Sequence, residues 1–286
     1  METDRPELLG AVADTCRGWE GAADAGARFL RLTLRLGRCP SGTGEPDIQV
    51  DVQRLRVRGS GVDAWADAAS GCAECVISED YLIAGEAFRQ EVLDPLILFL
   101  LTRSGRTPIH ASGFMTGELA VLLAGPSGTG KSCLAFAAQK AGFKLLSDDA
   151  IYLQSQPELR IWGIPRPIHL FPEDAPAESG NVVRVRNGKL KHSVPMRAGC
   201  ESITARRAIL CILVPGTQVS LQPISQEEAM RAQGRFEAGF DLLQADIEDA
   251  LELLSRNGAW RLTLSSDPAE AISLLSENLS ALAAVA

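Results

Sequence analysis

The chain has 286 residues, a formal net charge of −8, and 46% hydrophobic against 22% charged residues. This length and composition suit a soluble globular protein with one large domain or two smaller ones. The negative charge argues against a broad nucleic-acid-binding surface, and the densest apolar run, 95–101, is too short to cross a membrane.

The first nine residues, METDRPELL, are acidic and lack the basic-then-apolar order of a secretion signal. Seven cysteines, an odd number scattered along the chain, do not suit a disulfide framework. We therefore expect a cytoplasmic protein that binds neither nucleic acid nor membrane.

Residues 1–90 favour β-structure. Apolar and polar residues alternate along 28–36 and 48–58 with the period of a β-strand, and the Pro, Gly and Ser residues of 40–46 predict a loop between them. Cys72 and Cys75 form a single Cys-x-x-Cys without a second ligand pair, so we interpret it as a turn rather than a metal or redox site.

Residues 91–286 are expected to form a second, catalytic domain. Residues 86–103 predict a helix that Pro95 shortens or kinks, and its apolar residues are expected to pack under a nucleotide-binding sheet. Further on, strand and helix patterns alternate, as in an α/β domain.

Residues 125–132 read GPSGTGKS, a full match to the phosphate-binding pattern G-x-x-x-x-G-K-[ST]. The apolar run 119–123 predicts a strand before this loop, and 132–140 predicts a helix after it, with Gly142 as a C-terminal stop. Such a loop directs backbone N–H groups and a helix N-terminus at phosphate oxygens. In this pattern Lys131 reaches the β- and γ-phosphates and Ser132 binds Mg²⁺.

The sequence therefore predicts binding of ATP with Mg²⁺. The residues expected to line the nucleotide are Gly125, Ser127, Gly128, Thr129, Gly130, Lys131, Ser132 and Cys133.

An acidic pair, Asp148 and Asp149, follows the helix within the segment FKLLSDDAIYL. One helix and a tight return separate the pair from Lys131, so we expect their strand beside the strand of the phosphate loop. One carboxylate would hold Mg²⁺, and the other would accept the proton of an attacking hydroxyl. The alternative is an acidic turn in solvent.

Residues 161–172, IWGIPRPIHLFP, are interrupted by prolines and predict a substrate-facing loop. Histidines 169 and 192 are expected to be packed or solvated rather than ligands. Beyond them we predict a strand over 206–214, helices from 225 and over 247–257, a strand over 260–264 and a helix from 267. Four arginines that could meet a phosphate or an acidic peptide are Arg166, Arg184, Arg186 and Arg197.

The order of these motifs resembles the catalytic domain of the HPr serine kinase/phosphorylase family. The resemblance covers Ile109-His110-Ala111-Ser112, the phosphate loop and Leu146-Ser147-Asp148-Asp149, and loosely the segments to about residue 265. It is closer to the short relatives of that family, which include lasso-peptide tailoring kinases. The resemblance implies a phosphoenolpyruvate-carboxykinase-like α/β fold with a mixed sheet, preceded here by the β-rich part.

The resemblance also implies roles for individual residues. Lys131 would neutralise the β- and γ-phosphates, Asp148 and Asp149 would supply base and metal contact in either order, and His110 would lie near the transferred phosphate. Metal contact would come from Ser132 and Asp148. Cys133 stands where the family carries an acidic residue. The segment around Gly163 matches the family's phosphorylase-associated segment only weakly, so reversal of phosphorylation is not expected.

Three hypotheses follow from the sequence. The first is a kinase that transfers the γ-phosphate of ATP to a serine-type hydroxyl of a peptide or small protein. Because the related family enzymes are oligomers, the resemblance also allows a homo-oligomer. The second is a small-metabolite kinase, and the third is a regulatory protein that binds nucleotide without catalysis.

Overall fold

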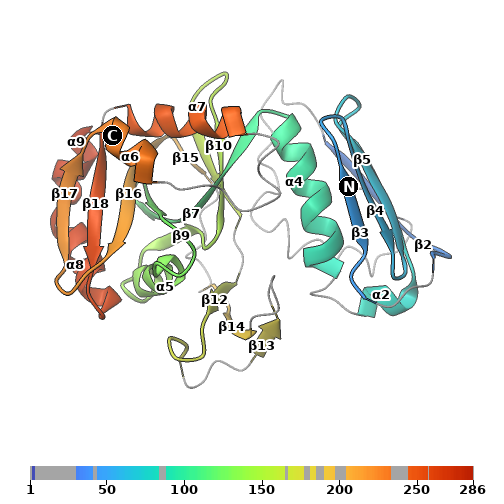
Figure 1. Cartoon of the computed structure of the whole chain (residues 1–286), viewed down its shortest axis with the longest axis horizontal. Helices are drawn as coiled ribbons and strands as arrows, with labels where there is room; N and C mark the ends of the chain where they lie inside the picture. The colour runs from blue at the N-terminus through green and yellow to red at the C-terminus, as the bar shows by residue number, and fades with distance from the viewer. Residues whose placement is uncertain are drawn as a thin grey trace. The chain divides into compact units, whose positions relative to one another are not determined.

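The computed structural model describes residues 2–3, 30–40, 44–83, 88–164, 167–176, 181–184, 190–196, 204–232, 244–256 and 258–285. The chain divides into two compact units, Met1–Arg106 and Thr107–Ala286 (Figure 1). The predicted mixed α/β architecture is confirmed, since helices pack on sheets that contain both parallel and antiparallel strand pairs.

The first unit contains a six-stranded sheet in the order β1-β2-β6-β5-β4-β3. Its strands are β1 (Glu2–Thr3), β2 (Arg31–Leu36), β3 (Asp47–Val50), β4 (Arg54–Gly59), β5 (Val62–Asp67) and β6 (Cys72–Ile77). The single strand expected over 48–58 is in fact two strands. Apolar residues fall on even positions up to Val52 and on odd positions from Leu55. In one continuous strand these two sets would point to opposite faces, so the segment divides into two strands.

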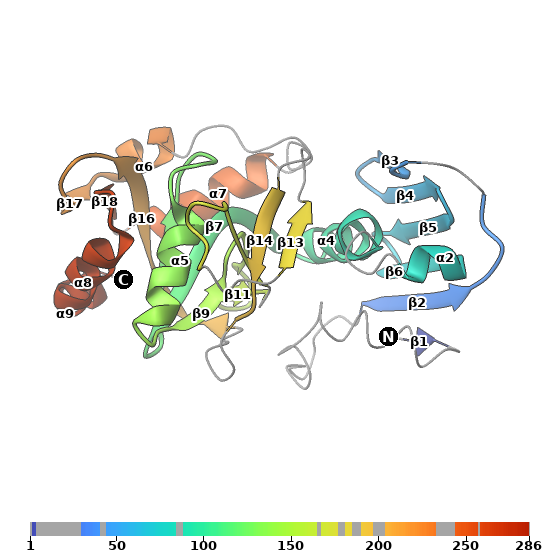
Figure 2. The same ribbon diagram turned by 90° about the horizontal axis from the view of Figure 1, so that it is seen from below.

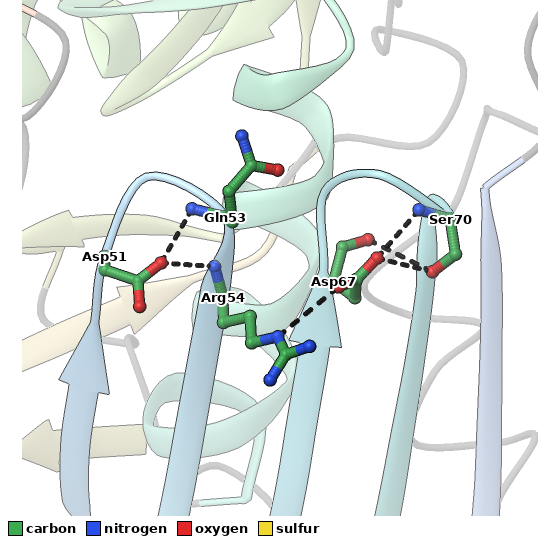
Figure 3. Close-up of polar contacts among 5 residues, drawn as sticks. All are labelled: Asp51, Gln53, Arg54, Asp67 and Ser70. Atoms are coloured by element: carbon green, nitrogen blue, oxygen red, sulfur yellow. Dashed lines mark hydrogen bonds and ion pairs between the residues drawn. The ribbon is translucent and has the colours of Figure 1, made fainter.

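Two aspartates fix turns of this sheet (Figure 3). The Oδ1 atom of Asp51 accepts hydrogen bonds from the backbone N–H groups of Gln53 and Arg54, each at 2.7 Å, and closes the β3–β4 turn. Asp67 Oδ1 accepts from the backbone N–H of Ser70 at 2.8 Å in the β5–β6 turn. These charge-assisted bonds lower the pKa of both carboxyl groups.

Cys72 and Cys75 lie on strand β6 and not in the predicted turn. An odd separation along a strand places two side chains on opposite faces, and accordingly Cys75 is buried whereas Cys72 is partly exposed. The two thiols therefore cannot share one metal ion or form a bond without unpairing the strand.

One face of this sheet is covered by helical residues: α2 (Glu79–Ile83), a π-helical turn η1 (Arg89–Leu93) and α4 (Asp94–Arg103). Pro95 is the second residue of α4, which directly follows η1, and the backbone at Leu93 and Asp94 stays helical, so its missing N–H falls where the π-helical turn passes into the α-helix. The expectation that this helix packs under the nucleotide-binding sheet is wrong. Its buried residues, including Leu96, Phe99 and Leu100, share a core with the first sheet, and α4 lies along that sheet in Figure 1.

The second unit is built on a sheet in the order β15-β11-β10-β7-β8-β16-β18-β17, with β9 paired to β7. Its strands are β7 (Arg106–Thr116), β8 (Leu119–Ala124), β9 (Lys144–Ser147), β10 (Ala150–Gln154), β11 (Arg160–Gly163), β15 (Thr204–Ala205), β16 (Arg207–Pro215), β17 (Ser220–Ile224) and β18 (Ala259–Leu264). Strands β8, β16 and β18 run parallel to one another, whereas β7 is antiparallel to β8 and β17 to β18.

Helices cover both faces of this sheet, as Figure 2 shows for α5 and α7. The helices are α5 (Lys131–Lys140), α6 (Gln226–Ala232), α7 (Gln244–Ser255), α8 (Pro268–Glu277) and α9 (Leu279–Val285). Alternate residues of β8 separate the two cores: Leu122 packs with α7, and Leu123 packs with α5 and α8. Strand β8 is consequently buried along its whole length, as its uninterrupted apolar run predicts.

A small sheet, β12-β14-β13, completes the described part of this unit. Its strands are β12 (Ile168–Leu170), β13 (Asn181–Arg184) and β14 (Leu190–Val194). The segment 161–172 is therefore not one loop as predicted, because it contributes the end of β11 and all of β12, and Ile168 and Leu170 are buried. Pro167 and Pro172 lie just before and after β12, where no ladder hydrogen bond is needed.

Candidate functional site

The predicted phosphate loop joins β8 to α5, so the strand, loop and helix occur in the expected order. Gly128 and Gly130 have φ values of 85° and 93°, a left-handed conformation that favours glycine. The Thr129 hydroxyl donates to the carbonyl of Pro126 at 2.8 Å and closes the turn. Helix α5 begins after Gly130 with no side-chain cap, so the N–H groups of its first turn are arranged as in an anion-binding helix terminus.

Lys131 folds back over the loop. Its Nζ atom donates hydrogen bonds to the carbonyl oxygens of Gly125 at 2.8 Å and Pro126 at 3.0 Å. The residue is only 7% exposed, so an ammonium charge is held close to the loop backbone. A positive charge in this position complements the phosphate groups of a nucleotide.

Asp148 lies directly after β9 and is 5% exposed. Its Oδ2 atom accepts a hydrogen bond from the backbone N–H of His169 at 3.1 Å, and its own carbonyl accepts one from the hydroxyl of Ser112. Its Oδ1 atom is buried and has no hydrogen-bond partner among the residues that the structure describes. A buried carboxylate oxygen without a partner is costly in a folded protein unless a ligand completes it.

Burial raises the pKa of Asp148 to about 6, and the neighbouring charge of Asp149 acts in the same direction. The hydrogen bond from the His169 backbone, the Ser132 hydroxyl and the positive charge of Lys191 oppose this rise in the pKa. These interactions place the Asp148 carboxyl, Ser132 and Lys191 in one neighbourhood, although they come from three separate elements.

Asp149 has a different environment. Its side chain is 76% exposed, and its Oδ1 atom lies 3.2 Å from Nδ1 of His110, which is 22% exposed. His110 lies inside β7, and β7 is the strand that pairs with β9. The expectation that β9 lies beside β8 is therefore wrong: β7 and β16 occupy the two sides of β8, and this arrangement brings the histidine to the aspartate.

The other predicted residues have simpler positions. Ser127 is exposed at the tip of the loop. The Cys133 thiol is partly buried, and this burial, together with a hydrogen bond to Asp174, raises its pKa to about 12. Cys133 is therefore a neutral thiol and not a nucleophile. Arg166, Arg186 and Arg197 and the side chain of Arg184 lie outside the described residues.

Three contributions to the site were not predicted from the sequence. Ser112 and the backbone of His169 hold Asp148 in place, and Lys191 adds a positive charge nearby. The Lys191 Nζ atom lies 4.9 Å from the centre of the Phe171 ring, a cation–π distance. Sequence spacing gives no signal for these contacts, because β12 and β14 reach the site only through the tertiary fold.

A resident metal site of the usual kind is not present: in the described ranges, no group of three or more His, Cys, Asp and Glu side chains could hold a metal ion. Mg²⁺ in phosphoryl-transfer enzymes requires less from the protein, because it binds one or two side chains together with substrate phosphates and water. The unpartnered Oδ1 of Asp148 and the nearby hydroxyl of Ser132 fit such a shared site.

Comparisons with known proteins add little to this picture. No protein-family model and no curated protein matches the sequence. One similar solved structure is described as the Hpr(Ser) kinase/phosphatase from Coxiella burnetii; it is 15% identical, with 61% of this chain and 96% of that chain covered, at a TM-score of 0.33. A similarity this weak carries no argument about activity. Among the described residues, no helix is long and apolar enough to cross a membrane.

Proposed function

We propose that this protein is an ATP- and Mg²⁺-dependent kinase that transfers the γ-phosphate to a serine-type hydroxyl of a peptide or small protein. The observation that supports the proposal is the interaction of the buried Asp148 carboxyl with Ser132 of the phosphate loop, next to an exposed Asp149. The predicted resemblance to HPr serine kinases, and to their phosphoenolpyruvate-carboxykinase-like fold, rests on the same residues and supports the assignment.

The two aspartates receive different roles from their environments. Asp149 is exposed and bonded to His110, so it is accessible to an incoming hydroxyl and is assigned as the general base. Asp148 is buried, its Oδ1 atom has no hydrogen-bond partner among the described residues, and its carboxyl group interacts with Ser132, so these two residues are assigned to Mg²⁺. Bound Mg²⁺ would neutralise charge on the β- and γ-phosphates and favour the ionised form of Asp148.

The remaining chemistry uses the chain's own groups. The acceptor hydroxyl attacks the γ-phosphorus as its proton passes to Asp149, and the bond from the γ-phosphorus to the bridging oxygen breaks to release ADP. His110 orients the Asp149 carboxylate through Nδ1. Lys131 and the N–H groups at the start of α5 hold the phosphate oxygens in line.

The test is mass spectrometry of the purified protein with ATP, Mg²⁺ and the small proteins or peptides encoded beside its gene. We expect a gain of one phosphate on a hydroxyl residue, abolished by Lys131→Ala and reduced at least a hundredfold by Asp149→Asn. Glu118→Gln, which removes a carboxylate from an exposed turn outside the site, serves as the matched control.

The outcomes separate the hypotheses. Phosphate transfer that survives both site variants contradicts the assignment of the site. ATP turnover with small metabolites but no peptide phosphorylation favours the metabolite kinase. Nucleotide binding without turnover on any acceptor favours the regulatory protein.

A further inference from the structure

A cleft lies at the same edge of the main sheet as the phosphate loop. Strands β8, β16 and β18 are parallel, so their C-terminal ends share one edge, which is where open α/β sheets bind ligands. The loop follows β8, a turn at 216–219 follows β16, and α8 follows β18. The turn and α8 line a cleft of about 650 Å³, a size that suits a small ligand.

The end of β18, which leads into α8, lies close to the phosphate loop. A Cβ atom placed on Gly130 would lie 3.4 Å from Cδ1 of Leu264, the last residue of β18, and α5 packs directly against α8. The strand that leads to α8 is two positions from β8, a separation of about 10 Å at normal strand spacing. A ligand that begins on the loop and extends about 10 Å along the sheet edge would reach the start of α8, whose residues line the cleft.

The lining of the cleft is unsuitable for phosphate. Asp267, Glu270 and Glu277 make it acidic. The N-terminus of α8 is already capped, because Asp267 Oδ1 accepts from the backbone N–H of Ala269 at 2.9 Å. Both features repel an anion.

The same lining suits a neutral group with hydrogen-bond donors. The Glu270 carboxylate accepts a hydrogen bond from the Ser265 hydroxyl at 2.6 Å and has further acceptor capacity for ligand hydroxyl or amino groups. Gln218 and Ser273 add polar side chains, and Val219 and Leu274 add apolar surface for a flat ring. A nucleoside has these properties, because its ribose hydroxyls and base amino groups are hydrogen-bond donors and its base has a flat, apolar face.

We propose that this cleft holds the nucleoside part of the nucleotide whose phosphates occupy the loop. The inference rests on the proposed nucleotide-binding function and extends it to residues that no motif identifies. It predicts that the loop and the cleft contribute separately to affinity, since one binds the triphosphate and the other binds the ribose and base.

The test compares Mg²⁺-ATP with Mg²⁺-tripolyphosphate, which has the phosphates but no nucleoside, by isothermal titration calorimetry. Ser273→Arg fills the cleft from an exposed position on α8, and Ser276→Arg places the same side chain on α8 outside the cleft. We expect Ser273→Arg to weaken ATP binding at least tenfold and to change tripolyphosphate binding less than twofold. Ser276→Arg is expected to change neither affinity.

A second variant, Gln218→Ala, removes a cleft side chain without adding bulk and is expected to weaken ATP binding about threefold while leaving tripolyphosphate binding unchanged. The inference is overturned if the wild-type protein binds both ligands but the cleft variants leave ATP affinity unaltered, or if they weaken both ligands equally. Failure of the wild-type protein to bind either ligand contradicts the proposed function itself. The two failures are therefore distinguishable.

Discussion

The hydroxyl of Ser112, a fully buried residue of β7, donates a hydrogen bond to the main-chain carbonyl of Asp148. Two residues earlier on the same strand, His110 contacts Asp149. Residues two apart on a strand point to the same face, so one face of β7 holds both members of the acidic pair. Ser112 is therefore a positioning residue, and its removal tests whether the placement of the pair matters.

Ser112→Ala leaves the buried carbonyl of Asp148 without its hydroxyl donor. We expect a loss of about 1–3 kcal/mol in the free energy of unfolding, measured by urea denaturation. We also expect a fall of at least tenfold in kcat for phosphate transfer with little change in KM for ATP. Ser112→Cys, which keeps a weak donor of similar size, is expected to recover part of both losses; equal losses in the two variants would contradict the positioning role.

The pKa of Asp148 predicts how stability depends on pH in the metal-free protein. Its folded-state pKa of about 6 lies above the ordinary value of 3.8, so the folded state binds this proton more tightly than the unfolded state. The contribution of Asp148 to stability is therefore greatest below pH 4 and is lost as the pH rises through 6. A shift of this size corresponds to about 3 kcal/mol.

Asp148→Asn isolates that contribution, because the amide oxygen can still accept the His169 hydrogen bond without a charge. In EDTA, we expect the stability of the variant relative to wild type to rise by about 2.5 kcal/mol between pH 4 and pH 7.5, measured from urea unfolding curves. Asp149→Asn, at an exposed position, is expected to differ from wild type by less than about 0.5 kcal/mol throughout. A flat difference for Asp148→Asn would show that the buried carboxyl does not titrate as described.

The contact between His110 and Asp149 predicts coupling in catalysis. If His110 acts by orienting the general base, replacing it matters only while Asp149 is present. We expect His110→Gln and Asp149→Asn each to lower kcat at least tenfold, and the double variant to be no slower than Asp149→Asn alone. Multiplicative losses in the double variant would instead assign the two residues independent roles.

The sequence was most informative where local chemistry decides the structure. The pattern around the phosphate loop predicted the strand before it and the helix after it, since a run of buried apolar residues and a glycine-rich loop are local features of the sequence. The start of the last predicted helix at Asp267 is confirmed, and in the structure the Asp267 side chain accepts a hydrogen bond from the backbone N–H of Ala269.

Pairing between distant segments was not predictable in the same way. The apolar face of α4 fits either sheet by pattern alone, and only the tertiary fold places Phe99 in the first core. The number of residues between Lys131 and Asp148 is enough for one helix followed by a strand. It does not determine which strand β9 pairs with, because the same length is compatible with several strand orders. The contacts that distinguish Asp148 from Asp149 arise from these pairings, so the sequence left their roles open.

The structural role of Gly163 was also not predictable from the sequence. The family resemblance related this residue only to phosphorylase activity, whereas in the structure it allows two strands to pack closely. A Cβ atom at this position of β11 would lie 1.9 Å from the carbonyl oxygen of Leu146 on β9, two residues before Asp148. Gly163→Ala therefore forces β9 to shift. We expect a loss of about 3 kcal/mol in urea unfolding and at least a tenfold fall in kcat.

A matched variant on the same strand separates this clash from ordinary loss of packing. Ile161→Val removes one buried methyl group two residues away and is expected to cost about 1 kcal/mol, with kcat within twofold of wild type. If Gly163→Ala is no more harmful than Ile161→Val in both measurements, then close contact between β11 and β9 does not control the position of Asp148. If only stability falls, the glycine supports the fold without positioning the acidic pair.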